Sequence, residues 1–233
     1  MVKNMNKIFE ILNKYYGYNS FRKGQYEIIS NILRGRDSFC VLPTGAGKSI
    51  CYQIPALMFN GITIVISPLI SLMKDQVDNL NSNGINARYI NSTQKLEVSD
   101  EIIELCKKGE VKLLYIAPEK LENEFFKRKL RLLNISQIAI DEAHCVSMWG
   151  HDFRKSYGLI AESIDNLRIR PVVTAFTATA TEVVRKDVIN LLKLRNPYIY
   201  IGSFDRENLE IKLYIEEDKL ELVKDIIRER EGE

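Results

Sequence analysis

The sequence predicts an α/β fold, a mostly parallel β-sheet with helices on both faces. From Asp37 onward, short apolar runs alternate with segments of helical periodicity, which is the order expected of βαβ units. Some of these runs are continuous, such as Ile-Thr-Ile-Val-Ile at 62–66, and continuous runs are typical of strands buried on both faces. Right-handed crossover connections then place helices on both sides of the sheet.

Each element follows from a local pattern. Apolar residues at helical spacing around Ile8 and Leu12 predict a helix that ends near Gly17, and a second helix runs from about Lys23 to Leu33. The strands that follow are expected at residues 39–42, 62–66, 87–90, 113–116, 135–140, 172–176 and 198–201. The helices between these strands are expected to begin near Lys48, Leu69, Lys95, Glu122, Lys155 and Glu182.

The pattern changes after Gly202. Residues 209–215 alternate between apolar and polar side chains, as in a strand with one solvated face, and residues 216–233 predict a highly charged helix. The apolar stripe of this helix consists of Leu220, Val223, Ile226 and Ile227. We therefore expect two parts, residues 1–203 and 204–233, of which the second is the first strand and helix of a truncated domain.

Composition places the chain among ordinary globular proteins. Of its 233 residues, 45% are hydrophobic and 27% are charged. The formal net charge of +2 means that any contact with nucleic acid is local rather than spread over the surface. No apolar run reaches transmembrane length and the N-terminus is not a secretory signal, so we expect a cytoplasmic protein without a membrane partner.

The four cysteines lack the spacing of a metal site. They are Cys40, Cys51, Cys106 and Cys145, and no two of them form a C-x-x-C pair. We therefore expect no zinc site and no disulfide framework, but buried free thiols in a reducing compartment.

A glycine-rich turn separates the first predicted strand from the helix after it. Its sequence is Thr44-Gly45-Ala46-Gly47-Lys48-Ser49. Glycines let successive backbone N–H groups point at an anion, and the helix N-terminus adds partial positive charge. In such a phosphate-binding loop, Lys48 would reach the β- and γ-phosphates and the Ser49 hydroxyl would bind Mg²⁺. Leu42 replaces the first glycine of the strict pattern, and the alternative is a tight turn with a surface lysine.

An acidic pair follows the strand predicted at 135–140. Asp141 can hold Mg²⁺, and Glu142 can orient or deprotonate an attacking water. Because the carboxyl ends of parallel strands meet at one edge of a sheet, the acidic pair is expected beside the glycine-rich turn. The alternative is an acidic pair that favours the dipole of a helix start.

The next segment interleaves aromatic and cationic side chains. Residues 145–157 read CVSMWGHDFRKSY. Trp149 and Phe153 can stack on bases, while His151 and Arg154 supply positive charge for phosphates, and single-stranded nucleic acid needs both. The alternative is that Trp149 and Phe153 fill the core.

Together these motifs resemble those of superfamily 2 helicases, and further segments narrow the resemblance to the RecQ family of ATP-dependent DNA helicases. Residues 67–76 are similar to motif Ia, 145–157 to the aromatic-rich loop and 176–181 to motif III, and the resemblance runs from about Tyr16 to Leu209. The residues that it implies for DNA contact and coupling are Ser67, Ser71, His144, Trp149, His151, Phe153, Arg154, Thr177 and Thr179.

The segment at 16–25 resembles the adenine-recognition motif of this family. By that match, Tyr18 stacks on the base, Gln25 hydrogen-bonds the edge of the base and Arg22 assists. From the residues alone, the segment offers an aromatic face and an amide of the right type, and helix capping explains it equally well.

One threonine of motif III also has a simpler explanation. Thr179-x-x-Glu182 fits a capping box for the next helix, which leaves Thr177 to contact the acidic box, Asp141-Glu142-Ala143-His144.

The resemblance implies a RecA-like P-loop NTPase domain that uses ATP and Mg²⁺. It further implies single-stranded and tailed duplex DNA as partners, 3′-to-5′ unwinding, and a role in DNA repair and recombination. Residues 204–233 would open a second RecA-like domain that is missing here and that supplies an arginine finger, so we expect this chain to bind ATP but to hydrolyse it weakly. The alternatives are an RNA-directed helicase of the same superfamily and a non-catalytic module that binds nucleotide or single-stranded DNA.

Overall fold

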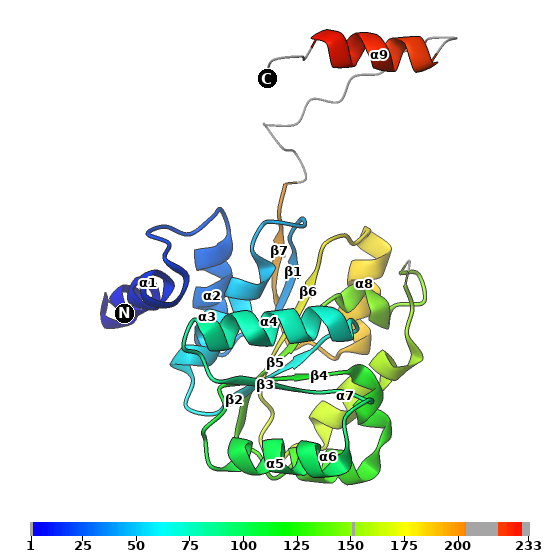
Figure 1. Cartoon of the computed structure of the whole chain (residues 1–233). Helices are drawn as coiled ribbons and strands as arrows, with labels where there is room; N and C mark the ends of the chain where they lie inside the picture. Colours follow the sequence, from blue (N-terminus) through cyan, green and yellow to red (C-terminus); the bar gives the residue numbers. More distant parts are fainter. Residues whose placement is uncertain (1, 151, 204–218, 230–233) are drawn as a thin grey trace. The chain divides into compact units, whose positions relative to one another are not determined.

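Figure 1 shows the computed structural model, which describes residues 2–150, 152–203 and 219–229. The chain divides into two units, residues 1–203 and 204–233, which are described separately. In the first unit, parallel strands form one seven-stranded sheet in the order β3-β4-β2-β5-β6-β1-β7. The strands are β1 (Ser38–Val41), β2 (Ile62–Ile66), β3 (Ala87–Ile90), β4 (Leu113–Ile116), β5 (Ile135–Ile140), β6 (Val172–Thr177) and β7 (Tyr198–Ile201).

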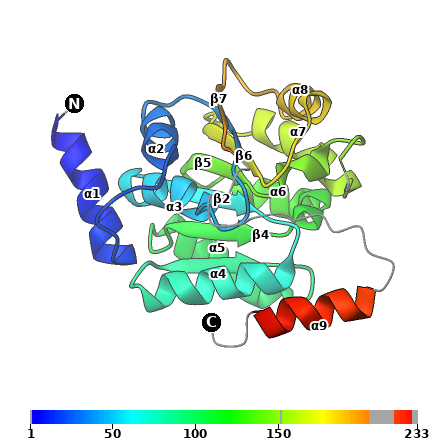
Figure 2. The ribbon, with the colours of Figure 1, turned by 90° about the horizontal axis from the view of Figure 1, so that it is seen from above.

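Helices cover both faces of this sheet, which confirms the predicted fold class. They are α1 (Val2–Tyr16), α2 (Gln25–Leu33), α3 (Lys48–Met58), α4 (Ile70–Ser82), α5 (Leu96–Lys107), α6 (Glu124–Leu130), α7 (Leu159–Asp165) and α8 (Glu182–Leu191). Helices α2, α3 and α4 share one buried apolar cluster with the sheet, and α5 to α8 share another with its opposite face. Helix α1 forms an outer layer against α2 and α3, as Figure 2 shows.

The strand boundaries agree closely with those predicted. Strand β1 begins and ends one residue earlier than expected, and β6 extends one residue further, to Thr177. Helix α6 is preceded by a 3₁₀ turn, Pro118–Glu122, and α7 by a 3₁₀ turn, Lys155–Gly158. The start expected near Lys155 therefore belongs to this turn rather than to an α-helix.

In the second unit, the structure describes α9 (Lys219–Glu229). This helix lies within the one predicted at 216–233 and carries the apolar stripe. The strand predicted at 209–215 lies outside the described residues.

Two expectations from composition can be compared with the structure. All four cysteines are buried and free, as expected. Burial raises the pKa of the Cys106 and Cys145 thiols to about 12, so both stay protonated at neutral pH. Within the part of the chain that the structure describes, no helix has the length and apolar character needed to cross a membrane.

The parallel register brings the ends of the central strands to one edge of the sheet. Val41, the last residue of β1, pairs with Thr177 at the end of β6, and Ile66 at the end of β2 pairs with Ile140 at the end of β5. A hydrogen bond of 2.8 Å from the Asp141 N–H to the Ile66 carbonyl extends this pairing. The segments that follow these strands therefore leave the sheet together, and they carry the predicted motifs.

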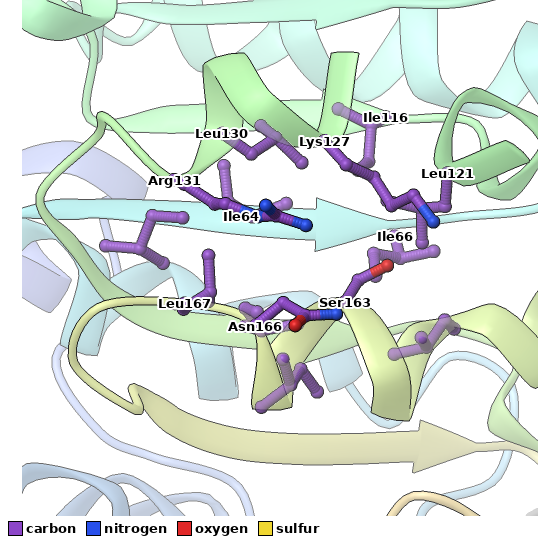
Figure 3. Close-up of a pocket in the computed structure, with 14 residues that line it drawn as sticks. Ile64, Ile66, Ile116, Leu121, Lys127, Leu130, Arg131, Ser163, Asn166 and Leu167 are labelled. Atoms are coloured by element: carbon purple, nitrogen blue, oxygen red, sulfur yellow. The ribbon is translucent and has the colours of Figure 1, made fainter. Parts of the chain in front are cut away.

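A small cavity of about 20 Å³ lies between the sheet and helices α6 and α7 (Figure 3). Most of its wall consists of isoleucine and leucine side chains, such as Ile64 of β2 and Ile138 of β5. The Lys127 ammonium at its margin pairs with Glu124 and, at 3.7 Å, with Glu162. A cavity of this volume holds about one water molecule. It is therefore a packing defect of the apolar core rather than a ligand site.

Candidate nucleotide site and nucleic-acid loops

A polar cavity of about 460 Å³ opens at the carboxyl edge of the sheet, and its volume suits a nucleotide. It is lined by Tyr18, Ser20, Arg22, Gln25, Thr44, Gly45, Gly47, Lys48, Ser49, Ile50, Leu72, Gln76, Asp141 and Glu142. The structure thus brings together the residues predicted for nucleotide and metal binding, with the exception of Ala46. Ala46 packs against the apolar cluster between the sheet and helices α2 to α4.

Part of the cavity wall was not predicted from the sequence. Leu72 and Gln76 lie on α4, within the segment 67–76 that was interpreted only as a DNA contact. Their spacing of four residues places both on one face of the helix, which is the signal that could have paired them. Only the fold shows that this face borders the cavity rather than another part of the surface.

The loop after β1 has the geometry of an anion site. Gly45 and Gly47 have φ values of 82° and 80°, a left-handed conformation that favours glycine. Helix α3 begins at Lys48 without a side-chain cap, so its first backbone N–H groups have no helical partner. These N–H groups and the helix dipole stabilise negative charge such as that of a phosphate.

Gln25 holds this loop through its amide. The Gln25 Nε2 group donates to the carbonyls of Ala46 and Gly47, at 3.1 and 3.2 Å, and its Oε1 accepts from the Arg22 N–H at 2.9 Å. The Arg22 guanidinium donates to the Gly45 carbonyl. A Cβ atom at Gly47 would lie 2.4 Å from Gln25 Nε2, so glycine is required for this close contact as well as for its φ.

Tyr18, on the rim of the cavity, is 52% exposed and can stack on a base. Gln25, by contrast, is buried and its N–H groups are engaged with the loop. The contact of Gln25 with a base stays a prediction, and the structure adds a role in positioning the phosphate-binding loop.

The acidic pair after β5 lies opposite the loop lysine. The Lys48 ammonium contacts the Glu142 carboxylate at 3.1 Å, although the two residues are 94 positions apart. Glu142 has a left-handed backbone, with φ of 46°, and its N–H donates to the Asp141 carboxylate at 3.0 Å. A nucleotide phosphate would therefore compete with Glu142 for Lys48.

Asp141 is a desolvated carboxylate. Burial raises the pKa of Asp141 to about 6, and the Lys48 ammonium opposes this rise. The Tyr157 hydroxyl donates to the Asp141 carbonyl at 3.0 Å and so holds the backbone that carries the carboxylate. A buried, poorly solvated carboxylate gains from a neighbouring cation.

The donor set fits Mg²⁺. The Ser49 hydroxyl and the Asp141 carboxylate line the same cavity, and both are oxygen ligands of the type that Mg²⁺ prefers. Across residues 2–150, 152–203 and 219–229, no group of three or more His, Cys, Asp or Glu side chains is placed to hold a metal ion. Mg²⁺ held by Ser49 and Asp141 would complete its coordination with phosphate and water oxygens.

A chain of polar contacts leads from the acidic pair to the end of β6. The ring nitrogen Nδ1 of His144, which is buried, lies 3.3 Å from the Glu142 carboxylate and 2.9 Å from the Thr177 hydroxyl. The Thr177 hydroxyl in turn donates to the Thr179 carbonyl at 2.9 Å. The predicted contact of Thr177 with the acidic box is therefore confirmed, and it is made through His144.

The capping box predicted at Thr179 is wrong. Helix α8 begins at Glu182, and its N-cap is Thr181, whose hydroxyl accepts from the Val184 N–H at 3.3 Å. The physical reason is that an N-cap directly precedes the first helical residue, whereas Thr179 lies two residues earlier and its carbonyl is bound by Thr177. Thr179 is thus part of the polar contacts that lead to the acidic box, whereas Thr181 stabilises the start of α8.

The loop after His144 exposes its aromatic side chains. Trp149 is 75% exposed and Phe153 is 46% exposed, so the interpretation of these two residues as core filling is wrong. Tyr157, from the same segment, is fully buried and does belong to the core. His151 lies outside the described residues.

Arg154 connects this loop to the segment after β2. Its guanidinium donates to the Pro68 carbonyl at 3.0 Å and contacts the Asp152 carboxylate at 3.4 Å. Ser67, beside Pro68, is buried, whereas Ser71 in the first turn of α4 is exposed. A direct phosphate contact in this segment would therefore fall to the Ser71 hydroxyl rather than to Ser67.

Comparison with known proteins adds independent findings. The family model described as DEAD/DEAH box helicase matches residues 22–187. The chain is 48% identical over 204 residues to the ATP-dependent DNA helicase RecQ of Pasteurella multocida, which covers 88% of this chain and 32% of that protein. It is 46% identical over 230 residues to RecQ of Bacillus subtilis, covering 98% of this chain and 39% of that protein. The chain thus spans only about a third of the length of these relatives.

Solved structures share the fold at lower sequence identity. The DUF1998 helicase MrfA bound to DNA and AMPPNP superimposes with a TM-score of 0.69 at 20% identity, over 84% of this chain and 29% of that one. A hypothetical ATP-dependent RNA helicase from Sulfolobus tokodaii gives a TM-score of 0.66 at 20% identity, over 84% of this chain and 57% of that one. At this identity, the likeness concerns the fold alone.

Proposed function

The chain belongs to the DEAD/DEAH box helicase family, and from this premise we propose that it forms the ATP-binding lobe of a RecQ-type ATP-dependent DNA helicase. The observation that carries the proposal is the contact of Lys48 with Glu142 across a cavity that Ser49 and Asp141 also line. These four side chains follow two strand ends, and they are of the types that bind the phosphates, hold Mg²⁺ and position the water in phosphoryl transfer.

Each of these side chains has a role in the proposed reaction. Lys48 leaves Glu142 and neutralises charge on the β- and γ-phosphates of ATP, while Ser49 and Asp141 hold Mg²⁺. Mg²⁺, when bound, supplies further charge neutralisation at the phosphates. Glu142, released from Lys48, orients or deprotonates the water that attacks the γ-phosphate, and His144 holds the Glu142 carboxylate in position.

Single-stranded DNA is the proposed partner of the exposed loops. Trp149 and Phe153 offer stacking faces, and Arg154 places positive charge between their loop and Pro68. The path from this loop to the nucleotide runs through His144, whose ring contacts both Glu142 and Thr177. The relatives at 48% and 46% identity are named as DNA helicases, which favours DNA over RNA.

Unwinding is proposed for the longer protein rather than for this chain. Residues 204–233 would open a second RecA-like domain, and that domain would bring an arginine finger worth about 10³–10⁵ in rate. Tailed duplex DNA and 3′-to-5′ polarity belong to the same proposal. A single lobe also lacks the closing and reopening movement that strand translocation needs.

The test begins with residues 1–233 titrated with Mg²⁺-ATP in a calorimeter and with labelled single-stranded DNA and RNA by fluorescence anisotropy. We expect ATP and DNA binding, little turnover, and DNA-stimulated turnover only in the longer protein. RNA stimulation without DNA stimulation would support the RNA-directed alternative. Failure to bind ATP would overturn the proposal, and binding without turnover in the longer protein would leave only the non-catalytic alternative.

A further inference from the structure

A buried glutamine joins four elements near the nucleotide cavity. Gln53, on α3, is only 4% exposed. Its Oε1 accepts from the Tyr16 hydroxyl of α1 at 3.1 Å, and its Nε2 donates to Gln76 Oε1 of α4 and to the Tyr115 hydroxyl of β4, each at 3.1 Å. One amide therefore connects α1, α3, α4 and β4.

Each contact of this amide leads toward a part of the nucleotide site. Tyr16 lies two residues before Tyr18, and Gln76 itself lines the cavity. Tyr115 and Tyr52 belong to the same buried cluster, and Tyr52 lies three residues after Ser49 on α3. Gln53 itself does not line the cavity. Its role would therefore be to position residues that do, such as Gln76.

The same contacts lead to the nucleic-acid side of the molecule. Gln76 is part of α4, which begins just after Pro68, the residue whose carbonyl binds Arg154. Tyr115 precedes Ile116, whose carbonyl accepts from the Ser67 N–H at 3.2 Å. A shift of α4 or of the end of β4 would therefore move the segment that contacts the aromatic loop.

We propose that Gln53 is a positioning residue that couples occupancy of the nucleotide cavity to the position of α4 and of the loop at 67–71. The inference rests on the proposed function, because it takes the cavity as the ATP site and the loops as the DNA site. Its physical basis is that a buried amide must keep its partners, so displacement by a bound nucleotide of Gln76, or of Tyr16 through its neighbour Tyr18, is passed on to the others. Coupling of this kind is reciprocal between the two ligands.

The experiment measures the affinity of residues 1–233 for fluorescein-labelled oligothymidine, with and without saturating Mg²⁺ and a non-hydrolysable ATP analogue. The ratio of the two dissociation constants is the readout, because it does not depend on either affinity alone. We expect the nucleotide to change DNA affinity by at least about fivefold in the wild-type chain. Gln53→Met, which keeps the volume and removes the amide, should bring this ratio close to one.

The matched control is Gln137→Met. Gln137 is also a fully buried glutamine, and it contacts Thr174 and Thr63 inside the same sheet at 3.1 and 3.4 Å. We expect a comparable loss of stability but a wild-type ratio. If Gln53→Met does not fold, Gln76→Met at the half-buried end of the contact tests the same coupling.

The outcomes separate this inference from the proposed function. If the wild-type chain binds both ligands but the ratio is one, or if Gln53→Met and Gln76→Met retain the wild-type ratio, the coupling role of Gln53 is overturned while the ATP and DNA sites stand. If Gln137→Met also abolishes the ratio, the effect is one of general stability and the role is again overturned. Failure of the wild-type chain to bind either ligand would overturn both proposals.

Discussion

The apolar cavity of Figure 3 and the nucleotide cavity differ in place, size and lining. The cavity of about 20 Å³ lies under the middle of the sheet and is walled mainly by isoleucine and leucine, whereas that of about 460 Å³ lies at the strand ends and holds both charges and glycines. Side chains along a strand can interdigitate with a helix, so the first cavity retains little free volume. Strand ends carry loops that cannot pack in this way, and polar groups there remain available for a ligand.

The largest expected effect comes from the small cavity. Ile64→Ala, at a position that is 1% exposed, should lower the free energy of unfolding by about 2–5 kcal/mol, because it enlarges a void that cannot collapse fully. Urea denaturation measures this change. The affinity for Mg²⁺-ATP of the folded variant should stay at the wild-type value, and a large loss of ATP affinity would break the division between the two cavities.

Asp141 should make stability depend on pH in the absence of metal. Its pKa is raised from 3.8 to about 6, so the folded state binds the proton more tightly than the unfolded state does. Between about pH 4 and pH 6, the wild-type chain should therefore lose stability relative to Asp141→Asn as pH rises, by up to about 3 kcal/mol, with a constant difference above pH 6. Denaturation in EDTA at several pH values checks this. If the stability of Asp141→Asn relative to the wild-type chain stayed constant or fell as the pH rose from 4 to 6, this prediction would be contradicted.

Lys48→Ala should act on the ligand and not on the core. Loss of the ammonium removes a charge-assisted contact with phosphate, so Mg²⁺-ATP affinity should fall by about 1.5–3 kcal/mol, or roughly 10–150-fold. Asp141→Asn should weaken Mg²⁺-dependent binding more than metal-free binding. Calorimetric titration that finds unchanged ATP affinity in both variants would end the assignment of the large cavity.

Trp149→Ala should weaken DNA binding and leave the properties of both cavities unchanged. Base stacking is worth about 1–3 kcal/mol, so anisotropy should show weaker binding of single-stranded DNA with unchanged ATP affinity. Leu132→Ala is the matched control, because Leu132 is also exposed, at 61%, and does not line the nucleotide cavity. In the longer protein, Trp149→Ala or Arg154→Ala should lower DNA-stimulated ATPase and spare the basal rate. Equal DNA affinity in Trp149→Ala and Leu132→Ala would show that exposure of the ring has no function.

The smallest expected effect concerns the two threonines between β6 and α8. Thr181→Ala removes the N-cap of α8 and should cost about 1 kcal/mol of stability. Thr179→Ala keeps the carbonyl that binds Thr177 and should change stability by less than about 0.5 kcal/mol. Thermal unfolding of the two variants compares them directly. The reverse order would restore the capping box that the structure rejects.

Much of the fold and the main part of the site could be predicted because they depend on local patterns. The run at 62–66 and its counterparts are apolar in an unbroken order, and this order is enough to identify buried parallel strands. The glycines of the loop and the acidic residue after β5 could then be placed together, because parallel strands end at a common edge. Lys48 and Asp141 were found in this way without any knowledge of their distance.

Side-chain partners were harder to predict, because they depend on residues far apart in the sequence. Gln25 was interpreted as a contact for the base, yet its amide binds the loop carbonyls of Ala46 and Gly47. Core filling stood as the alternative for Trp149 until the fold exposed its ring. The cap of α8 was misplaced by two residues, since the start of a helix is set by backbone geometry that composition does not reveal.

By itself, the sequence determined the α/β class, the positions of the strands and the chemical identity of the site residues, because periodicity and residue type are local properties. The tertiary structure decided that Lys48 meets Glu142, that His144 bridges Glu142 to Thr177, and that Gln53 joins four elements. Apart from that of His144 with Glu142, these contacts span tens of residues, and they exist only when the register of the strands and the packing of the helices have been fixed. A hydrogen bond requires its two atoms to come within about 3 Å, and no spacing along the chain specifies that distance.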